Sequence, residues 1–209
     1  NNADARALVT HHSLMDVAEE AAGQCPSLQD NLVVTGQAHH HSEQSEESVQ
    51  PMAYPGWKDF WELLEQTPPA SPSDAVKELD SGLVGSKDIS MLVYTSGTTG
   101  NPKGVMITHE MYVAAGQGFA SWIGASSGDR FFTCLPLFHA NAQYYSTMGS
   151  LAVGASLVLA DRFSASSFWD QVRSSDATVV NFIGMMMPVL LKQPPSQEDV
   201  VNSVRLFYG

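Results

Sequence analysis

The sequence predicts an α/β fold with mostly parallel sheets and helices on both faces of them. Strand and helix patterns alternate from residue 130 to residue 191, as expected of a doubly wound sheet. A separate strand–helix–strand pattern occupies residues 5–35, and its second strand is rich in β-branched residues, which indicates a parallel unit. Short apolar runs thus alternate with segments that carry one apolar helical face.

The N-terminal unit is predicted to begin with a short strand at residues 5–10. Ser13 is expected to cap the following helix, because Asp16 stands three residues later at the spacing of a capping box. Gly23 is expected to end this helix, and residues 31–35 form the second strand.

A polar stretch follows at residues 36–56, rich in His, Ser, Glu and Gln, and we predict a solvated, mobile surface loop. His39–His41 could bind a metal in principle, but no acid or Cys stands at a fixed spacing from them, so a surface loop is favoured. No metal site is predicted elsewhere. The amphipathic helix that comes next is expected to pack through Trp57, Phe60, Trp61 and Leu64.

The second half of the chain supplies the remaining elements of the predicted sheet. Ser164 is expected to cap the helix that presents Phe168, Trp169 and Val172. In chain order we expect helix 109–123, strand 130–134, helix 142–153, strand 156–159, the helix after Ser164, strand 178–181, helix 185–191 and a strand within 204–209.

Composition restricts the class of partner. The chain has 10 Lys and Arg against 22 Asp and Glu, a net charge of −12, which argues against nucleic acid. Its two cysteines, Cys25 and Cys134, have no metal or redox spacing; a disulfide between them is possible but unsupported, and a reducing, cytoplasmic compartment is expected. No run reaches the roughly 18 apolar residues of a membrane span. The ends suggest one partial domain over residues 1–209, truncated at both termini.

A loop rich in Gly, Ser and Thr joins two β-favouring runs, residues 91–94 and 105–108. Glycines let backbone N–H groups approach an anion, hydroxyls add donors, and Lys103 adds a positive charge. The loop is not a Walker A motif, because Asn101 and Pro102 separate Gly100 from the lysine and a strand pattern follows. A phosphate-binding loop of another construction is therefore predicted.

The run Y-T-S-G-T-T-G-N-P-K-G-V resembles the signature loop of the adenylate-forming superfamily, which comprises acyl-CoA synthetases, peptide-synthetase adenylation domains and beetle luciferases. The resemblance implies that the chain is part of the large N-terminal domain of such an enzyme. It also implies an ATP phosphate-binding set of Thr95, Ser96, Gly97, Thr98, Thr99, Gly100 and Lys103.

The run P-L-F-H-A-N, which ends at Asn141, resembles the family's aromatic-and-histidine motif at the acyl pocket. With F-I-G at residues 182–184, it is most similar to bacterial acyl-CoA ligases of the crotonobetaine/carnitine-CoA ligase type. A buried core histidine is the alternative for His139, and ordinary core packing is the alternative to a soft pocket wall for Met185–Met187. The resemblance implies an acyl and CoA tunnel of His139, Asn141, Tyr145, Ile183 and Gly184, with Tyr208 and Gly209 on the adenine side.

The implied reaction is ATP-dependent activation of a carboxylic acid to an acyl-adenylate, followed by transfer to the thiol of CoA. ATP, a carboxylic acid and CoA are then the small-molecule partners, and Mg²⁺ is a cofactor whose Glu ligand is expected beyond residue 209. No catalytic residue is assignable within the chain, and the chain alone is expected to be inactive. The alternatives are a non-catalytic nucleotide- or partner-binding remnant, or an enzyme that adenylates aryl or amino acids. A small or medium acyl chain is expected, and the oligomeric state is left open.

Overall fold

The computed structural model describes residues 4–34, 54–69, 71, 73, 76–77, 82, 84–95 and 102–209. The chain divides into two compact units, residues 1–81 and residues 82–209, each of which is described by itself. The surface loop predicted at residues 36–56 and the three histidines within it lie almost wholly outside the described residues.

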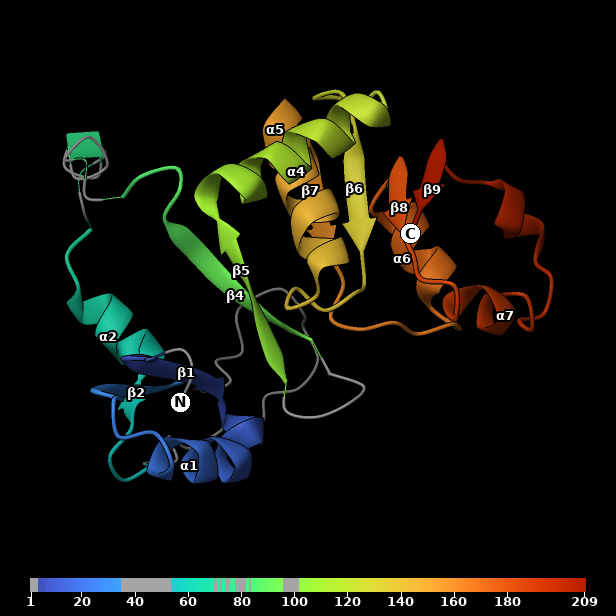
Figure 1. Cartoon of the computed structure of the whole chain (residues 1–209). Coiled ribbons are helices and arrows are strands. Elements are labelled where there is room, and N and C mark those ends of the chain that lie inside the picture. The colour runs from blue at the N-terminus through green and yellow to red at the C-terminus, as the bar shows by residue number, and fades with distance from the viewer. Residues whose placement is uncertain are drawn as a thin grey trace. The chain divides into compact units, whose positions relative to one another are not determined.

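The first unit is a parallel β–α–β arrangement, as predicted. Strands β1 (Ala7–His11), β2 (Asp30–Val34) and β3 (Lys58–Asp59) form a sheet in that order, with both pairs parallel. Helix α1 (Met15–Gly23) connects the first two strands, and α2 (Phe60–Gln66) follows the third (Figure 1). Asp59 caps α2 by accepting hydrogen bonds from the backbone N–H groups of the helix's first turn.

The prediction that Ser13 caps α1 is wrong. A short 3-10 turn, η1 (His12–Leu14), precedes the helix, and the backbone N–H of Ser13 donates to Nδ1 of His11 instead. Leu14 occupies the N-cap position of α1 and makes no side-chain cap bond. Leu64 of α2 is exposed rather than packed, whereas Phe60 and Trp61 of the same helix, and Trp57 before β3, are half-buried.

The second unit opens with the predicted strand–loop–strand. Strands β4 (Ile89–Thr95) and β5 (Lys103–Thr108) pair antiparallel, and Thr95 stands opposite Lys103 at the last pair. Helix α4 (His109–Trp122) follows directly, because Thr108 at its N-cap accepts a hydrogen bond from the backbone N–H of Met111 at 3.2 Å.

The rest of the second unit is built on a four-stranded parallel sheet, which confirms the predicted α/β class. Its strands are β6 (Arg130–Thr133), β7 (Ser156–Leu159), β8 (Val179–Asn181) and β9 (Leu206–Tyr208), arranged in the order β7-β6-β8-β9. The chain returns to the same direction after every helical connection, as a parallel sheet requires.

The helix predicted at residues 142–153 consists of two different helices. Residues Asn141–Thr147 form a π-helix, η2, which continues into α5 (Met148–Val153). The prediction that Ser164 is a cap is wrong. Ser167 occupies the N-cap position without a side-chain cap bond, and its backbone N–H donates to the carbonyl of Ser164 in the preceding turn. The remaining helices are α6 (Phe168–Ser174), α7 (Met186–Leu190) and the 3-10 turn η3 (Gln197–Val200).

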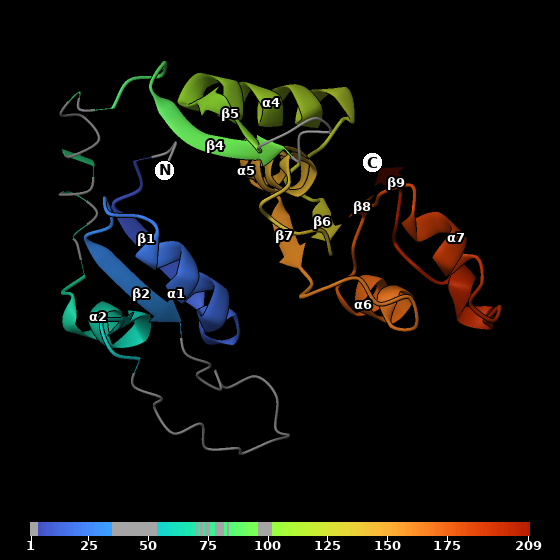
Figure 2. The same ribbon diagram turned by 60° about the horizontal axis from the view of Figure 1, so that its bottom comes forward.

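Helices cover both faces of this sheet. Neighbouring residues of a strand point to opposite faces, so adjacent side chains pack against different helices. Phe132 packs in a buried cluster with Phe168 of α6 and Met186 of α7. Phe131 packs on the other face in a cluster with Phe119 of α4. Figure 2 shows α4 on one side of the sheet strands and α6 on the other.

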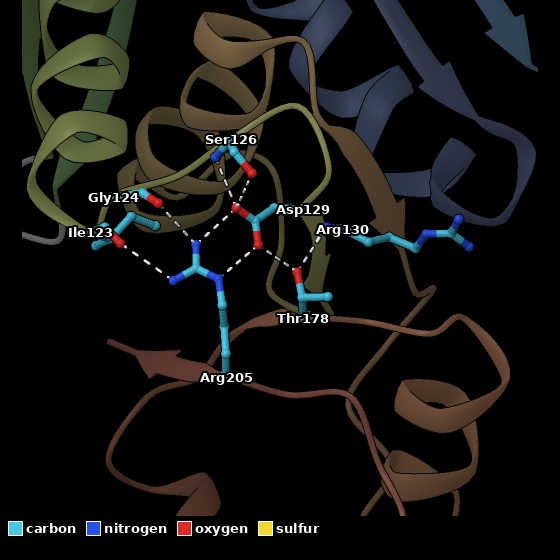
Figure 3. A network of polar contacts seen from close by, with 7 residues as sticks. All are labelled: Ile123, Gly124, Ser126, Asp129, Arg130, Thr178 and Arg205. Carbon is cyan, nitrogen blue, oxygen red and sulfur yellow. Dashed lines mark hydrogen bonds and ion pairs between the residues drawn. The ribbon is translucent and has the colours of Figure 1, made fainter.

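A network of polar contacts joins the amino ends of three strands (Figure 3). Asp129 lies just before β6 and Arg205 just before β9. The carboxylate of Asp129 accepts hydrogen bonds from Nε of Arg205 at 2.7 Å and from its Nη2 at 2.8 Å. The hydroxyl of Thr178, just before β8, donates to the same carboxylate at 2.8 Å, and so does the backbone N–H of Ser126. Arg205 also donates to the carbonyl of Ile123 at the end of α4.

We predict that Asp129→Asn destabilises the protein by about 1–3 kcal/mol at pH 7, since one partner of a mostly buried ion pair is lost. Hydrogen bonding by Arg205 holds the pKa of Asp129 well below its usual range. The stabilisation is therefore complete above the unfolded-state pKa of about 3.9 and is lost as the pH falls below that value. Denaturant unfolding of both proteins at pH 7 and pH 3 measures this, and the gap between them should narrow at pH 3.

Asp170→Asn is the matched control, because Asp170 pairs with Arg173 but its side chain is 71% exposed. Its effect should stay below about 1 kcal/mol. A gap between wild type and Asp129→Asn that is equal at the two pH values would contradict the assignment.

Two glycines of α4 differ sharply in their surroundings. A Cβ on Gly116 would stand 2.5 Å from Cβ of Met148 and 2.6 Å from its carbonyl carbon, so α4 and α5 approach closely there. A Cβ on Gly118 would meet nothing within 4 Å.

We predict that Gly116→Ala lowers the free energy of unfolding by about 1–3 kcal/mol, because backbone must move to accommodate the methyl group. Gly118→Ala should raise it by up to about 1 kcal/mol through better helix propensity. Urea unfolding of the two variants checks this difference. A Gly116→Ala variant as stable as Gly118→Ala would show that the two helices are not in close contact.

Candidate functional site

The predicted phosphate loop is held between the paired ends of a β-hairpin. The hydroxyl of Thr95 lies 3.5 Å from the carbonyl oxygen of Lys103. Both residues are exposed, and within the described part of the chain the amine of Lys103 forms no ion pair. Ser96, Gly97, Thr98, Thr99 and Gly100 lie outside the described residues. The structure thus places the available positive charge of Lys103 where the loop ends and β5 begins.

His139 lies in the turn between β6 and the π-helix. Its backbone N–H donates to the carbonyl of Pro136 at 3.0 Å, and its ring packs on Phe138 with 4.4 Å between the centroids. The side chain is exposed, so the alternative of a buried core histidine is wrong. Among the described residues its imidazole forms no hydrogen bond, which leaves both ring nitrogens available.

A buried amide network fixes the start of the π-helix. The hydroxyl of Thr133 donates to Oδ1 of Asn181 at 3.0 Å, and Nδ2 of Asn181 donates to Oδ1 of Asn141 at 2.7 Å. Asn181 is fully buried at the end of β8, where an unpaired amide would be costly. Asn141 therefore holds the π-helix against the sheet. The sequence signal for this role was the polar Asn at the end of the apolar strand run.

A second link joins the π-helix to β9. The hydroxyl of Tyr208 lies 2.5 Å from that of Ser146, and both residues are buried. Burial raises the pKa of Tyr208 above its usual value, against the hydrogen bonds from Ser146 and Asn181. Phe119 of α4 packs between Tyr145 and Tyr208, with ring centroids 4.8 Å and 4.6 Å away.

A pocket of about 960 Å³ lies between α4, the π-helix and the ends of β8 and β9. It brings Tyr145, predicted for the acyl site, together with Tyr208 and Gly209, predicted for the adenine side. A Cβ on Gly209 would collide with the carbonyl of Phe182, so only glycine fits that wall. The described residues lining the pocket are Ala114, Ala115, Gly118, Phe119, Trp122, Ile123, Tyr145, Phe182, Leu206, Phe207, Tyr208 and Gly209.

The other predicted tunnel residues lie outside this pocket. His139 is exposed in the turn before the π-helix, Asn141 contacts Asn181 of the sheet, and Ile183 packs partly buried against the core. Gly184 is exposed, and a Cβ there would meet nothing within 4 Å, so within the described structure its small size relieves no contact.

The three methionines do not form one wall. Met186 is buried in the core, whereas Met185 and Met187 are exposed, and none of them lines the pocket. The lining residues of α4 were not predicted as site residues. Their only sequence signal was the small size of Ala114, Ala115 and Gly118 on one side of the helix.

Comparisons with known proteins define the class. The family of AMP-binding enzymes matches residues 1–209, so the chain belongs to that family. Crotonobetaine/carnitine–CoA ligase of Salmonella arizonae is 37% identical over 150 residues, which is 70% of this chain and 26% of that protein. Long-chain fatty acid transport protein 3 of Mus musculus is 38% identical over 122 residues, 58% of this chain and 18% of that protein. The chain therefore spans about a quarter or less of these relatives.

Solved structures share the fold. Anthranilate CoA ligase AuaEII in complex with anthranoyl-AMP superposes with a TM-score of 0.76 at 22% identity, over 98% of this chain and 36% of that one. The N-terminal domain of FACL13 from Mycobacterium tuberculosis gives 0.70 at 19% identity, over 99% of this chain and 44% of that one. At these identities the likeness establishes the α/β fold.

The described residues include no group of three or more His, Cys, Asp or Glu side chains placed to hold a metal ion. None of the helices described is both long and apolar enough to span a bilayer. Cys25 and Cys134 are both free thiols.

We predict that Ser146→Ala lowers the free energy of unfolding by about 1–3 kcal/mol, because it leaves the buried hydroxyl of Tyr208 with one partner fewer. Ser150→Ala is the control, since Ser150 is equally buried but its hydroxyl donates to the carbonyl of Thr147, the N-cap of its own helix. Its loss should be smaller, because the substitution leaves no buried side-chain hydroxyl without a partner. Thermal unfolding of both variants tests this, and equal losses would contradict a special role for the Tyr208 contact.

Proposed function

We propose that the protein containing this chain is an AMP-forming acid–thiol ligase that joins a carboxylic acid to CoA. The observation that carries the proposal is the β-hairpin that presents Thr95 and Lys103 at the two ends of the Gly/Ser/Thr loop, in a chain matched throughout by the AMP-binding family. The names of the relatives, which include CoA ligases, support the same reaction class.

The proposed reaction has two steps. A carboxylate oxygen attacks the α-phosphorus of ATP and pyrophosphate leaves, which gives an acyl-adenylate. The thiolate sulfur of CoA then attacks the acyl carbon, and AMP leaves with the electron pair of the broken C–O bond. Both steps depend mainly on positioning the reactants and on neutralising charge.

The hairpin loop would hold the departing pyrophosphate. Backbone N–H groups and hydroxyls from Thr95 to Gly100 would donate to its oxygens, and the amine of Lys103 would offset the charge that grows on them. Antiparallel pairing of the flanking strands keeps the two ends of the loop opposite each other. Thr95 and Lys103 are thus held opposite each other before ATP binds.

The pocket beside α4 would take the acid. Tyr145 stands on one wall, and Tyr208 and Gly209 stand at the strand ends where ligands of parallel sheets commonly bind. His139 and Asn141, at the start of the π-helix, would border the path of CoA, and Ile183 and Gly184 would flank it. Mg²⁺ would neutralise phosphate charge, and the family resemblance implies a Glu ligand for it outside the described residues.

We predict that Lys103→Ala slows ATP–pyrophosphate exchange by on the order of 10–100-fold, because the substitution removes one positive charge that would offset the negative charge of the leaving pyrophosphate. The measurement uses the whole protein with a panel of carboxylic acids. Lys192→Ala is the control, since Lys192 is also an exposed lysine but lies after α7, and its exchange should match wild type.

Exchange that continues unchanged in Lys103→Ala would contradict the assigned role of the lysine. If wild type gives no exchange with any acid, the chain belongs to a non-catalytic nucleotide- or partner-binding member of the family. Exchange restricted to aryl or amino acids would keep the mechanism and move the substrate class.

A further inference from the structure

We propose that Tyr144 of the π-helix is a positioning residue for the β-hairpin formed by β4 and β5. Its contacts with Met91 and Tyr112 fix strand β4, and the pairing of the two strands then fixes where the side chain of Lys103 stands. This assignment rests on the proposed ligase function and adds a residue to its phosphate site.

Tyr144 links the hairpin to two other elements. Its hydroxyl donates to the sulfur of Met91 in β4 at 3.9 Å. Its ring meets that of Tyr112 in α4 edge-on, with 5.4 Å between the centroids. All three side chains are half-buried. Within the described part of the chain, no other side chain from outside the hairpin hydrogen-bonds to β4 or β5. The hairpin and the π-helix are therefore joined at Tyr144.

The register of the hairpin puts Met91 on the same face as Lys103. Met91 is paired with Ile107, and Thr95 is paired with Lys103. Directly opposite residues of an antiparallel pair share a face, and so do residues two apart along a strand. Thr95 and Lys103 thus lie on the face of Met91, four residues along β4, which is about 13 Å at the usual rise of a strand. Ile107 is 7% exposed and Lys103 is exposed, so this face is packed at one end and open at the other.

The hairpin needs such an attachment because it has only two strands. Among the described residues, β4 and β5 pair with each other and with no further strand. An isolated two-stranded hairpin is marginally stable, so its position depends on packing against other elements. Strand β5 continues directly into α4, where Thr108 caps the helix. The contact of Tyr144 with Met91 supplies the second attachment, on the partner strand.

The π-helix that carries Tyr144 is itself fixed on both sides of this residue. Before it, Asn141 accepts a hydrogen bond from Asn181 of β8 at 2.7 Å. After it, the hydroxyl of Ser146 lies 2.5 Å from that of Tyr208 of β9. Short π-helical segments are common at functional sites. Tyr144 therefore relates the hairpin to the strands whose ends form the pocket.

The test is a double-mutant cycle between Tyr144→Leu and Lys103→Ala, measured by ATP–pyrophosphate exchange of the whole protein. Tyr144→Leu should lower kcat about 10-fold and leave the KM of the acid unchanged, because misplacing one charged group by a small distance is costly. In the Lys103→Ala background, Tyr144→Leu should cause no further loss, since residues that act through one another are not additive.

Two variants separate positioning from a general loss of stability. Tyr144→Phe keeps the ring that packs on Tyr112, so it should recover most of the activity lost in Tyr144→Leu. Asp129→Asn is the destabilised control, because Asp129 lies in the polar network before β6, and its folded form should keep the wild-type kcat.

Met91→Ala removes the same contact from the side of the hairpin and serves where Tyr144→Leu does not fold. It should reproduce the loss of kcat and its dependence on Lys103. Losses that add fully to that of Lys103→Ala would overturn the assignment, and so would a changed KM of the acid with an unchanged kcat.

Exchange absent from wild type with every acid would overturn the proposed function. Binding of MgATP, measured by calorimetry on the same set of variants, then decides the role of Tyr144 separately. The assignment requires that Tyr144→Leu weaken this binding only where Lys103 is present. A wild type that neither catalyses exchange nor binds MgATP would overturn both proposals.

Discussion

The buried polar link from Thr133 through Asn181 to Asn141 is the constraint on which the site depends. Asn181 is fully buried, so both ends of its amide must be paired, and the partners come from β6 and from the π-helix. This requirement fixes where the π-helix begins. The contact between Ser146 and Tyr208 fixes it again one turn later. Tyr145, between these two anchors, is thereby held at the pocket, where it packs on Phe119.

The two ends of the parallel sheet are joined by different chemistry. At the amino ends, the Asp129–Arg205 ion pair, supported by Thr178, joins the residues that precede β6, β8 and β9. At the carboxyl ends the links are neutral amides and hydroxyls. Arg205 is 40% exposed, so its guanidinium keeps contact with water although Asp129 is buried, whereas a charge beside an apolar pocket would lose its water. The sheet therefore keeps its charges away from the end where the proposed acyl chain would bind.

Local patterns predicted most of the elements but not how the helices begin. The β-hairpin around Thr95 and Lys103 and the four parallel strands follow from short apolar runs, which determine strands locally. The predicted caps at Ser13 and Ser164 are wrong because the chain makes a further turn before each helix. Both serines lie in that turn and form its hydrogen bonds, so neither stands at the N-cap of the helix. The sequence predicts an ordinary helix where the π-helix lies, since its apolar residues suit either winding.

The sequence by itself determined the family, the α/β class and the loop that resembles a phosphate-binding signature, because each is written in consecutive residues or in regular periods. Only the tertiary structure decided which residues form the pocket. Its walls come from α4, the π-helix and β9, and the contact that joins the last two spans 62 positions of the chain. The small size of Gly118 is by itself a weak signal for such a role, since a pocket beside a helix forms only when distant segments pack around it.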